Sequence, residues 1–395
     1  MALSRLLVPN VRGLPRAFWF LVTAALIDRI GGFAQVYLAI YLTTKVSVAM
    51  AGVMVSLLSL GGLAGGPLGG ALADRLGRKP VIMGGLLFTA CSWLNVAHAD
   101  GLVFTGASLV LAGFASSLAR PAMAAAIGDV VPESERRRAY GYHYWAINLG
   151  FAVAASVAGA LSRVSWNLVF GLDALSSVVA AAFLWFAMRH VKPKAAPATG
   201  TSALGWRDLV TGPFRDGVFM LLVLQGVMNS SMFMQLSVPL ATEMKSHGLE
   251  ALYGPITAIN GILIVLLQPT VTQLASRART SWVLGLGCFL VGLGFFLTAF
   301  CSAWWQFGGS IAVWTLGEIL LASTMPAVIA KLAPPDRRAT YQGLFQMSWS
   351  VSAFAPALGA FILEGAGSLA LWSLCLVGGL VGVFIQVRLS RSPRM

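Results

Sequence analysis

The chain has 395 residues, of which 57% are hydrophobic and only 10% are charged. Soluble domains carry about 25% charged residues, so this composition excludes a water-soluble protein and leaves almost no room for a soluble domain. The formal net charge of +13 favours a nucleic-acid-binding protein at first sight, but the positions of the basic residues give it another meaning.

Stretches of roughly 20 apolar residues, long enough to cross a bilayer, recur along the chain. Residues 1–16 are basic and precede such a stretch, as in a signal peptide, but Asp28 and Arg29 interrupt it and no small-residue cleavage site follows. We therefore expect this segment to be retained as the first of twelve spans. The predicted spans are residues 17–43, 47–73, 80–98, 102–129, 139–162, 166–188, 216–242, 252–276, 281–301, 304–330, 339–363 and 367–388.

Under this assignment, all but five of the 27 Lys and Arg residues fall on one side of the membrane. The exceptions are Lys45, Arg163 and Lys245 on the other side, and Arg29 and Arg120 within spans. The positive-inside rule then places both termini and the central linker in the cytoplasm. The basic residues thus set the topology, and we expect no nucleic-acid partner.

A charged turn, Gly70-Ala-Leu-Ala-Asp-Arg-Leu-Gly-Arg-Lys79, joins the second and third spans. Upstream, glycines at 61, 65 and 69 and at 62, 66 and 70 occupy adjoining helical faces, a spacing that lets helix backbones approach closely in a membrane. The turn resembles the loop between the second and third helices of major facilitator superfamily transporters: Gly, three residues, Asp, Arg or Lys, any residue, Gly, then basic residues. The resemblance implies an all-α membrane protein with twelve helices in two six-helix bundles.

The resemblance also assigns a role to this turn. In the family the aspartate approaches the N-terminus of the eleventh span and a basic group of the other half, which closes the cytoplasmic side. A carboxylate at a helix N-terminus gains roughly 0.3–1 kcal/mol. The predicted gate residues are Gly70, Asp74, Arg75, Gly77, Arg78 and Lys79.

An internal repeat supports two similar halves. Pro121 in the fourth span recurs as Pro326 in the tenth, Pro67 recurs as Pro269, and Arg137-Arg138-Ala139 recurs as Arg337-Arg338-Ala339. Two parallel six-helix repeats with a substrate site at the bilayer midplane are typical of this transporter fold. We predict an N-terminal bundle at 1–188, a cytoplasmic linker at 189–215 and a C-terminal bundle at 216–395.

Charged side chains within spans are candidates for the coupling mechanism, because each costs roughly 2.5–3.5 kcal/mol or more at the bilayer centre. They are Asp28 and Arg29 in the first span, Arg120 in the fourth and Glu318 in the tenth, with Asp173 as a shallower case. We hypothesise that Asp28, Glu318 or both carry the transported proton, with Arg29 and Arg120 as their partners. The alternative is fixed ion pairs between helices.

Several uncharged residues are candidates for lining the substrate cavity. Gln35 shares a helical face with Asp28, whereas Trp314 and Met325 share one with Glu318. The others are Asn148, Gln225, Asn229, Asn260 and Gln268, for each of which interhelical hydrogen bonding is the open alternative. The aromatic cluster Tyr140–Trp145 at the start of the fifth span is interpreted as an interfacial anchor, with substrate contact as the alternative.

The function that follows is secondary active transport, as proton-coupled antiport that exports amphiphilic small molecules by alternating access. Residues 314–318 and 341–343 resemble bacterial multidrug exporters in particular. The alternatives are proton-coupled uptake of a nutrient or peptide and, more remotely, a membrane receptor or enzyme, although the sequence has no HExxH, phosphate-loop or catalytic-triad pattern.

The expected partners are a small-molecule substrate and the lipid bilayer, and we expect a monomer in a bacterial-type inner membrane. No cofactor other than the coupled proton is expected. No metal site is expected either, because Cys91, Cys288, Cys301 and Cys375 lack CxxC spacing and are interpreted as small core residues.

Overall fold

The computed structural model describes residues 13–46, 48–188, 212–249, 252–392 and 394. Within these ranges every regular element is helical, and twelve segments are long and apolar enough to cross a membrane. This confirms the predicted all-α fold with twelve spans. The sides on which the termini lie stay a prediction.

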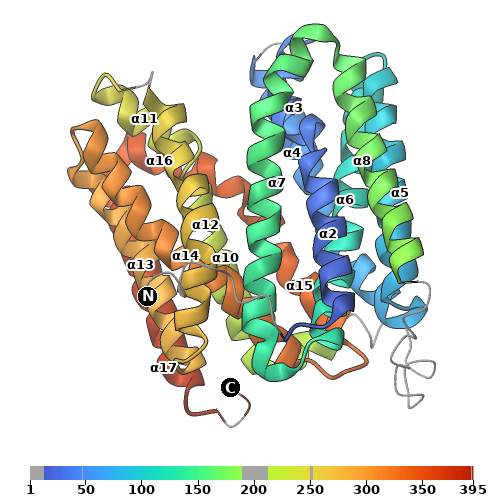
Figure 1. Cartoon of the computed structure of the whole chain (residues 1–395). Coiled ribbons are helices and arrows are strands. Elements are labelled where there is room, and N and C mark those ends of the chain that lie inside the picture. Colours follow the sequence, from blue (N-terminus) through green and yellow to red (C-terminus); the bar gives the residue numbers. More distant parts are fainter. Residues whose placement is uncertain (1–12, 47, 189–211, 250–251, 393, 395) are drawn as a thin grey trace, which may run out of the picture.

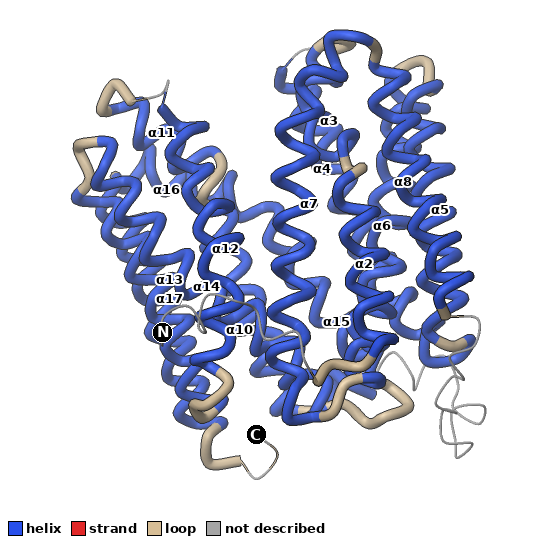
Figure 2. Tube along the Cα trace, viewed as in Figure 1, coloured by secondary structure: helices blue, strands red, loops and turns tan. Residues whose placement is uncertain are grey.

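Helices of the first half form one group in space and most helices of the second half form another (Figure 1). Figure 2 shows that loops are confined to the ends of the helices and to short breaks within them. The first-half elements are α2 (Arg16–Ile30), α3 (Phe33–Thr43), α4 (Val48–Leu76), α5 (Arg78–His98), α6 (Leu102–Val130), η1 (Glu133–Glu135), α7 (Arg136–Val164) and α8 (Trp166–Ala187).

The second half repeats this order of long helices. Its elements are η3 (Gly212–Arg215), α10 (Gly217–Met234), α11 (Val238–Ser246), α12 (Tyr253–Ala275), α13 (Thr280–Leu297), η5 (Thr298–Phe300), α14 (Trp304–Leu332), α15 (Arg338–Val351), η6 (Ser352–Phe354), α16 (Ala355–Ala366) and α17 (Ser368–Leu389). Most of the predicted linker, at 189–211, lies outside the described residues, so the domain boundaries stay a prediction.

Three spans that the sequence analysis treats as continuous are broken. The first divides at Gly31–Gly32 between α2 and α3, the seventh at 235–237 between α10 and α11, and the eleventh at η6 between α15 and α16. Glycine lowers helix stability at the first break, and a proline within the first two residues of α11 and of α16 removes a backbone donor at the others.

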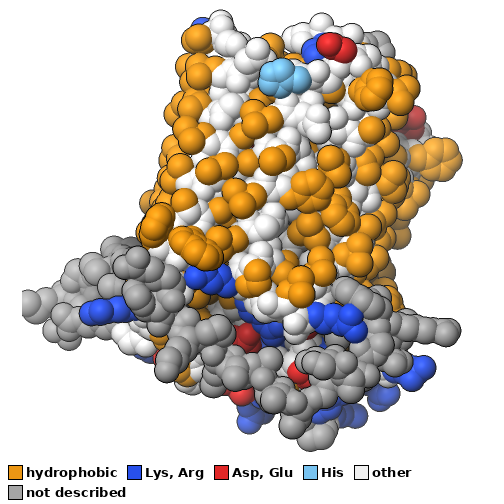
Figure 3. All heavy atoms as spheres, turned by 90° about the vertical axis from the view of Figure 1, so that its right-hand side faces the viewer, with side chains coloured by type: hydrophobic (Ala, Val, Ile, Leu, Met, Phe, Trp, Pro, Cys, Tyr) orange, Lys and Arg blue, Asp and Glu red, His pale blue; other side chains and the backbone are white. Residues whose placement is uncertain are grey.

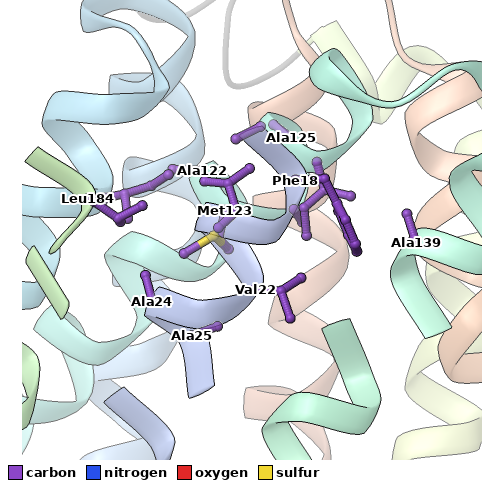
Figure 4. Packing of buried hydrophobic residues seen from close by; sticks show 14 of the residues in the cluster. Phe18, Val22, Ala24, Ala25, Ala122, Met123, Ala125, Ala139 and Leu184 are labelled. Atoms are coloured by element: carbon purple, nitrogen blue, oxygen red, sulfur yellow. The ribbon is translucent and has the colours of Figure 1, made fainter. Parts of the chain in front are cut away.

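The apolar core consists of several clusters, of which the largest lies mainly in the first half and also includes Ala330 and Ala339 of the second. In the first half, small alanine side chains of α6 lie against α2, so that Phe18 and Val22 pack beside Ala122 and Ala125 (Figure 4). In the second half, the Phe295 ring stacks on Trp314 and on Trp372. One outer face of the molecule carries hydrophobic side chains over most of its height, with Lys and Arg gathered at its lower edge (Figure 3).

The two glycine faces of α4 serve two different contacts. A Cβ added at Gly61, Gly65 or Gly69 would lie within 2.3 Å of a backbone oxygen of α6, in the same half. A Cβ at Gly70 would lie 2.3 Å from the Ala339 carbonyl oxygen of α15, in the other half. The close helix approach that the spacing predicts is therefore present, and one face joins the two halves.

Candidate functional site

The two halves meet most closely at the end formed by the α4–α5, α6–α7 and α14–α15 turns. We call it the basic end, because it carries Arg75, Arg78, Lys79, Arg137 and Arg338. Toward the opposite, far end the two groups of helices diverge (Figure 1). The contacts between halves that are described below lie between the basic end and the middle of the spans.

Asp74, at the end of α4, binds the N-terminus of α15. Its side chain is fully buried and accepts hydrogen bonds from the backbone N–H groups of Ala339 (3.2 Å) and Thr340 (2.7 Å). The Thr340 hydroxyl donates a third bond at 2.7 Å, and Arg78 lies 2.6 Å away. A negative side chain at a helix N-terminus satisfies free N–H groups and interacts favourably with the helix dipole.

Arg78 continues this contact into a chain of ion pairs. Its Nε atom lies 3.0 Å from Asp129 of α6, and the other oxygen of Asp129 lies 2.6 Å from Arg338 of the second half. Asp129 thus joins arginines of both halves. The sequence analysis missed this residue, although an acid at the basic end of a span is a signal for such a pair.

The remaining predicted gate residues differ in their positions. Gly77 has φ +94°, a conformation that favours glycine and permits the turn from α4 to α5. Arg75 is exposed. Lys79 lies over the Trp185 ring of α8 at 4.9 Å, so it contacts its own half and is not part of the contact between halves.

Arg136 and Arg338 are equivalent residues in the two halves. Arg136 Nε donates to the Gly128 carbonyl at 3.0 Å, and Arg338 Nε donates to the Ala330 carbonyl at 3.1 Å. In each pair the arginine lies eight residues after its acceptor. The repeat is therefore aligned at an offset of 202 residues here, and not at the offset of 200 used to match Arg137-Arg138 with Arg337-Arg338.

Glu318 lies at the middle of α14, within the membrane-spanning part, and is 8% exposed. Its carboxylate accepts a hydrogen bond from Asn260 Nδ2 of α12 at 2.7 Å and another from the Tyr144 hydroxyl of α7. Asn260 also contacts the Thr315 hydroxyl at 3.1 Å. Donors from both halves thus converge on one buried acid.

Asp28 and Arg29 form a second polar cluster in the first half. The Ser177 hydroxyl of α8 donates to Asp28 at 2.8 Å, and Arg29 Nε lies 4.0 Å from the same carboxylate. Arg29 also donates to Gln35 at 3.3 Å. Arg120 lies within electrostatic range of Asp28 and Arg29, and its buried Nε atom has no partner among the described residues.

Asp173 has a structural role beside this cluster, since it accepts a hydrogen bond from the Ala34 N–H at 2.9 Å and so satisfies the N-terminus of α3. Asp28 and Glu318 share no hydrogen-bond or ion-pair partner among the described residues. The two predicted proton-carrying acids therefore belong to separate clusters.

Four of the predicted cavity-lining residues contact other side chains of the second half, and their place in a cavity stays a prediction. Trp314 is 1% exposed and packs between Phe295 and Phe233 in the second-half core, and Met325 lies in another part of that core. Gln225 is fully buried, where it donates to Cys288 of α13 at 2.8 Å, and Asn229 donates to the same sulfur at 3.5 Å. All four side chains therefore have partners within the second half in this state.

Gln268 is also fully buried, and its Nε2 atom lies 3.3 Å from the Thr272 hydroxyl. Thr272 packs against Gly141 of α7, so Gln268 lies at the closed contact between halves. Asn148 donates to the Tyr144 carbonyl at 3.0 Å within its own helix. Of the predicted cavity residues, Asn260 and Gln35 contact the candidate coupling residues directly.

The interpretation of the aromatic cluster of α7 as interfacial anchors is wrong. Tyr140 is 2% exposed and donates to the Ala124 carbonyl at 2.7 Å, and Trp145 donates to the Val265 carbonyl of the other half at 2.9 Å. Tyr144 lies eight residues after the start of α7, about 12 Å along the helix. The spacing of Tyr140, Tyr144 and Asn148 at four-residue intervals is the signal that marks this polar stripe.

Outside the spans, Asp216 fixes the start of the second half. It accepts a hydrogen bond from the Phe219 N–H at 3.2 Å and binds Arg394 at 2.7 Å. Burial raises the pKa of the Asp216 carboxyl, but the bonds from Arg394, Phe219 and Tyr341 outweigh burial and hold the pKa below its usual value.

Comparisons with known proteins agree with this architecture. The chain is 29% identical over 338 residues to the uncharacterized MFS-type transporter YttB of Bacillus subtilis (strain 168), covering 84% of both chains. It is 26% identical over 351 residues to a Na(+), Li(+), K(+)/H(+) antiporter of Planococcus maritimus, covering 80% of this chain and 81% of the relative. Multidrug resistance protein MdtH of Aeromonas hydrophila is 25% identical over 322 residues, or 80% of each chain.

Among solved structures, the human organic anion transporter MFSD10 (TETRAN) superposes with a TM-score of 0.78, covering 94% of this chain and 99% of that one. At 17% sequence identity this similarity shows the fold alone. The profile of the Major Facilitator Superfamily matches residues 18–356 and, in a second match, residues 256–394. The chain therefore belongs to the Major Facilitator Superfamily and is a multi-pass membrane transporter, not an enzyme.

Proposed function

We propose that this transporter is a proton-coupled antiporter that exports amphiphilic small molecules by alternating access in a bacterial inner membrane. The observation that supports it best is the buried Glu318 carboxylate, which receives hydrogen bonds from Tyr144 of one half and Asn260 of the other. Two of the relatives, an antiporter and a multidrug resistance protein, favour antiport over uptake.

Glu318 has the properties that a proton carrier needs. An ionised acid at mid-membrane depth is costly unless donors compensate its charge, and here both donors are neutral groups. Because neutral donors compensate the charge only in part, the surroundings of Glu318 decide whether it is ionised or protonated. A rearrangement of the two halves that removes one donor changes that balance, so proton binding and release follow the conformation.

The contacts of Asp74 and Asp129 define one end state of the cycle. Asp74 binds the backbone at the N-terminus of α15, and Asp129 binds Arg338, the first residue of that helix. Both contacts hold α15 against the first half at the basic end. With the basic end in the cytoplasm, as the positive-inside rule predicts, this state is closed to the cytoplasm and faces outward. Protons then reach Glu318 from the far end, and release inward requires these contacts to open.

The cluster of Asp28, Arg29 and Arg120 provides a second place where a proton or substrate can bind. Asp28 has a hydroxyl donor and an arginine near it, so its ionised form is already compensated. We therefore assign the main proton to Glu318 and assign substrate contact, or a second proton, to the cluster around Asp28. We propose a monomer as the working unit.

The test is flux in proteoliposomes with an imposed pH gradient, with ethidium as the amphiphilic probe and Na⁺ and K⁺ as separate probes. Antiport predicts that the proton gradient drives ethidium in the opposite direction, and that Glu318→Gln abolishes this coupling. Glu364→Gln, which changes an exposed acid, is the matched control and should retain it. Movement of substrate and protons in the same direction would establish symport, and proton-driven transport unchanged in both Glu318→Gln and Asp28→Asn would refute the coupling.

A further inference from the structure

We propose that Tyr144 is a positioning residue that holds the empty carrier closed at the basic end while Glu318 is ionised, and releases it when Glu318 is protonated. This inference rests on the proposed proton-coupled antiport and adds a requirement to it. An antiporter must not change conformation with neither proton nor substrate bound, because such a step lets either one leak.

The position of Tyr144 makes its bond dependent on the arrangement of the two halves. Tyr144 is on α7 of the first half and Glu318 is on α14 of the second. One residue further along α7, Trp145 donates to the Val265 carbonyl of α12 at 2.9 Å. A Cβ on Gly141, one turn earlier, would lie 2.6 Å from the Thr272 side chain of α12. Tyr144 therefore lies in a tight contact that must loosen when the basic end opens.

The groups that face Glu318 include no charged side chain among its described contacts. Tyr144, on α7, is the titratable neighbour, and α12 contributes the amide of Asn260. On the α13 side, Gly317 of α14 packs against Gly287 and Val291, which have no ionisable groups. The charge of Glu318 is thus compensated by two neutral donors, one of which lies across the interface.

Protonation changes the strength of this bond in a definite direction. An ionised carboxylate is an acceptor only, and hydrogen bonds to it are roughly twice as strong as bonds between neutral groups. Removing one donor from a buried charge also leaves that charge poorly compensated. We expect ionisation of Glu318 to favour the closed basic end by about five- to tenfold through Tyr144.

This arrangement gives the carrier two ways to pass between its states. A proton that arrives from the far end neutralises Glu318, which weakens the bond and permits the basic end to open. A substrate that enters at the open basic end can then supply its own donor to Glu318, in place of the Tyr144 hydroxyl, and accompany the return step. With neither present, opening exposes an ionised carboxylate that has lost a donor.

The test measures the conformational equilibrium directly, by double electron–electron resonance in nanodiscs between pH 5 and 9. Spin labels at Leu76 and Ser276 report the basic end, and labels at Val164 and Leu252 report the far end; all four positions are exposed. In the otherwise unchanged carrier, a rise in pH should increase the closed-to-open ratio at the basic end. Tyr144→Phe should lower that ratio at every pH, and the fall should be five- to tenfold greater at high pH than at low pH.

Two further variants separate this effect from a general structural one. Glu318→Gln should remove the pH dependence and hold the ratio near its low-pH value, and the ratio should stay independent of pH when this variant is combined with Tyr144→Phe. Tyr142→Phe, on the same helix, should retain the full pH response. An unchanged response in Tyr144→Phe, or an equal loss in Tyr142→Phe, overturns the inference.

The failure of this inference can be distinguished from that of the proposed function. If Tyr144→Phe loses the conformational response while proteoliposomes show no coupled proton movement, the role of Tyr144 stands and antiport is wrong. If proton-driven export is intact and Tyr144→Phe neither leaks protons nor shifts the equilibrium, antiport stands and the role of Tyr144 is refuted.

Discussion

Replacing Asp74 with asparagine is the most direct test of how the basic end closes. The carboxylate is fully buried and accepts three hydrogen bonds from Ala339 and Thr340, in addition to its ion pair with Arg78. Asparagine has nearly the same shape but no charge, and it turns an NH₂ group toward donors. The variant therefore weakens the contact with α15 without creating a cavity.

The magnitude follows from the contacts that remain. A hydrogen bond to a charged group contributes about 1.5–3 kcal/mol and one between neutral groups about 0.5–1.5 kcal/mol. The amide oxygen retains part of the contact, and Arg78 still has Asp129 at 3.0 Å, so no arginine is left unpaired. We expect the closed state to lose about 2–3 kcal/mol, which is a 30- to 150-fold fall in the closed-to-open ratio.

The assay is the distance distribution between spin labels at Leu76 and Ser276 in nanodiscs. Asp74→Asn should populate a longer distance that is rare in the parent protein. Asp100→Asn, which changes an exposed acid in the α5–α6 turn, is the matched control and should leave the distribution unchanged. A distribution unaffected by Asp74→Asn, or equally affected by the control, would refute the reasoning.

Three further predictions test other parts of the structure. Gly70→Ala should separate α4 from α15 and open the basic end, because its Cβ would lie 2.3 Å from a backbone oxygen. The spin-label distances at the basic end should therefore increase, whereas Gly84→Ala, which has open space around it, should not change them. Trp314→Ala should lower the free energy of unfolding by about 3–5 kcal/mol, as measured by chemical denaturation. Trp305→Ala, at an exposed position, should lower it little, and equal losses in the two variants would contradict the core assignment of Trp314. The folded pKa of Asp216 is lowered, so its bond to Arg394 should persist above the unfolded pKa of about 3.9 and be lost as pH falls through the folded value. Protection factors at residues 388–392, which are exchange rates corrected for the intrinsic effect of pH, should therefore be constant between pH 5 and 8 and match those of Arg394→Gln only in stronger acid.

Much of the fold could be predicted from the sequence because the signals are local. Apolar stretches of span length, the glycine spacing of α4 and the motif around Asp74 are properties of neighbouring residues, and none requires knowledge of which helices meet. The motif also directed attention to the N-terminus of α15, where the structure places the Asp74 carboxylate. Helix breaks in three spans were missed, since a single Gly or Pro within an apolar stretch does not show whether the helix bends or divides.

Twelve membrane spans and a charged turn of the superfamily's type between the second and third of them could be predicted from the sequence alone. The tertiary contacts were needed to show that Tyr144 donates to Glu318, that Asp129 joins Arg78 to Arg338, and that Trp314 lies in a core. The physical reason is that lipid and bundle interior are equally apolar, so hydrophobic pattern cannot tell which face of a membrane helix meets its neighbour. Tyr144 and Glu318 are 174 residues apart and Asp129 and Arg338 are 209 apart, so packing between distant segments fixes these contacts.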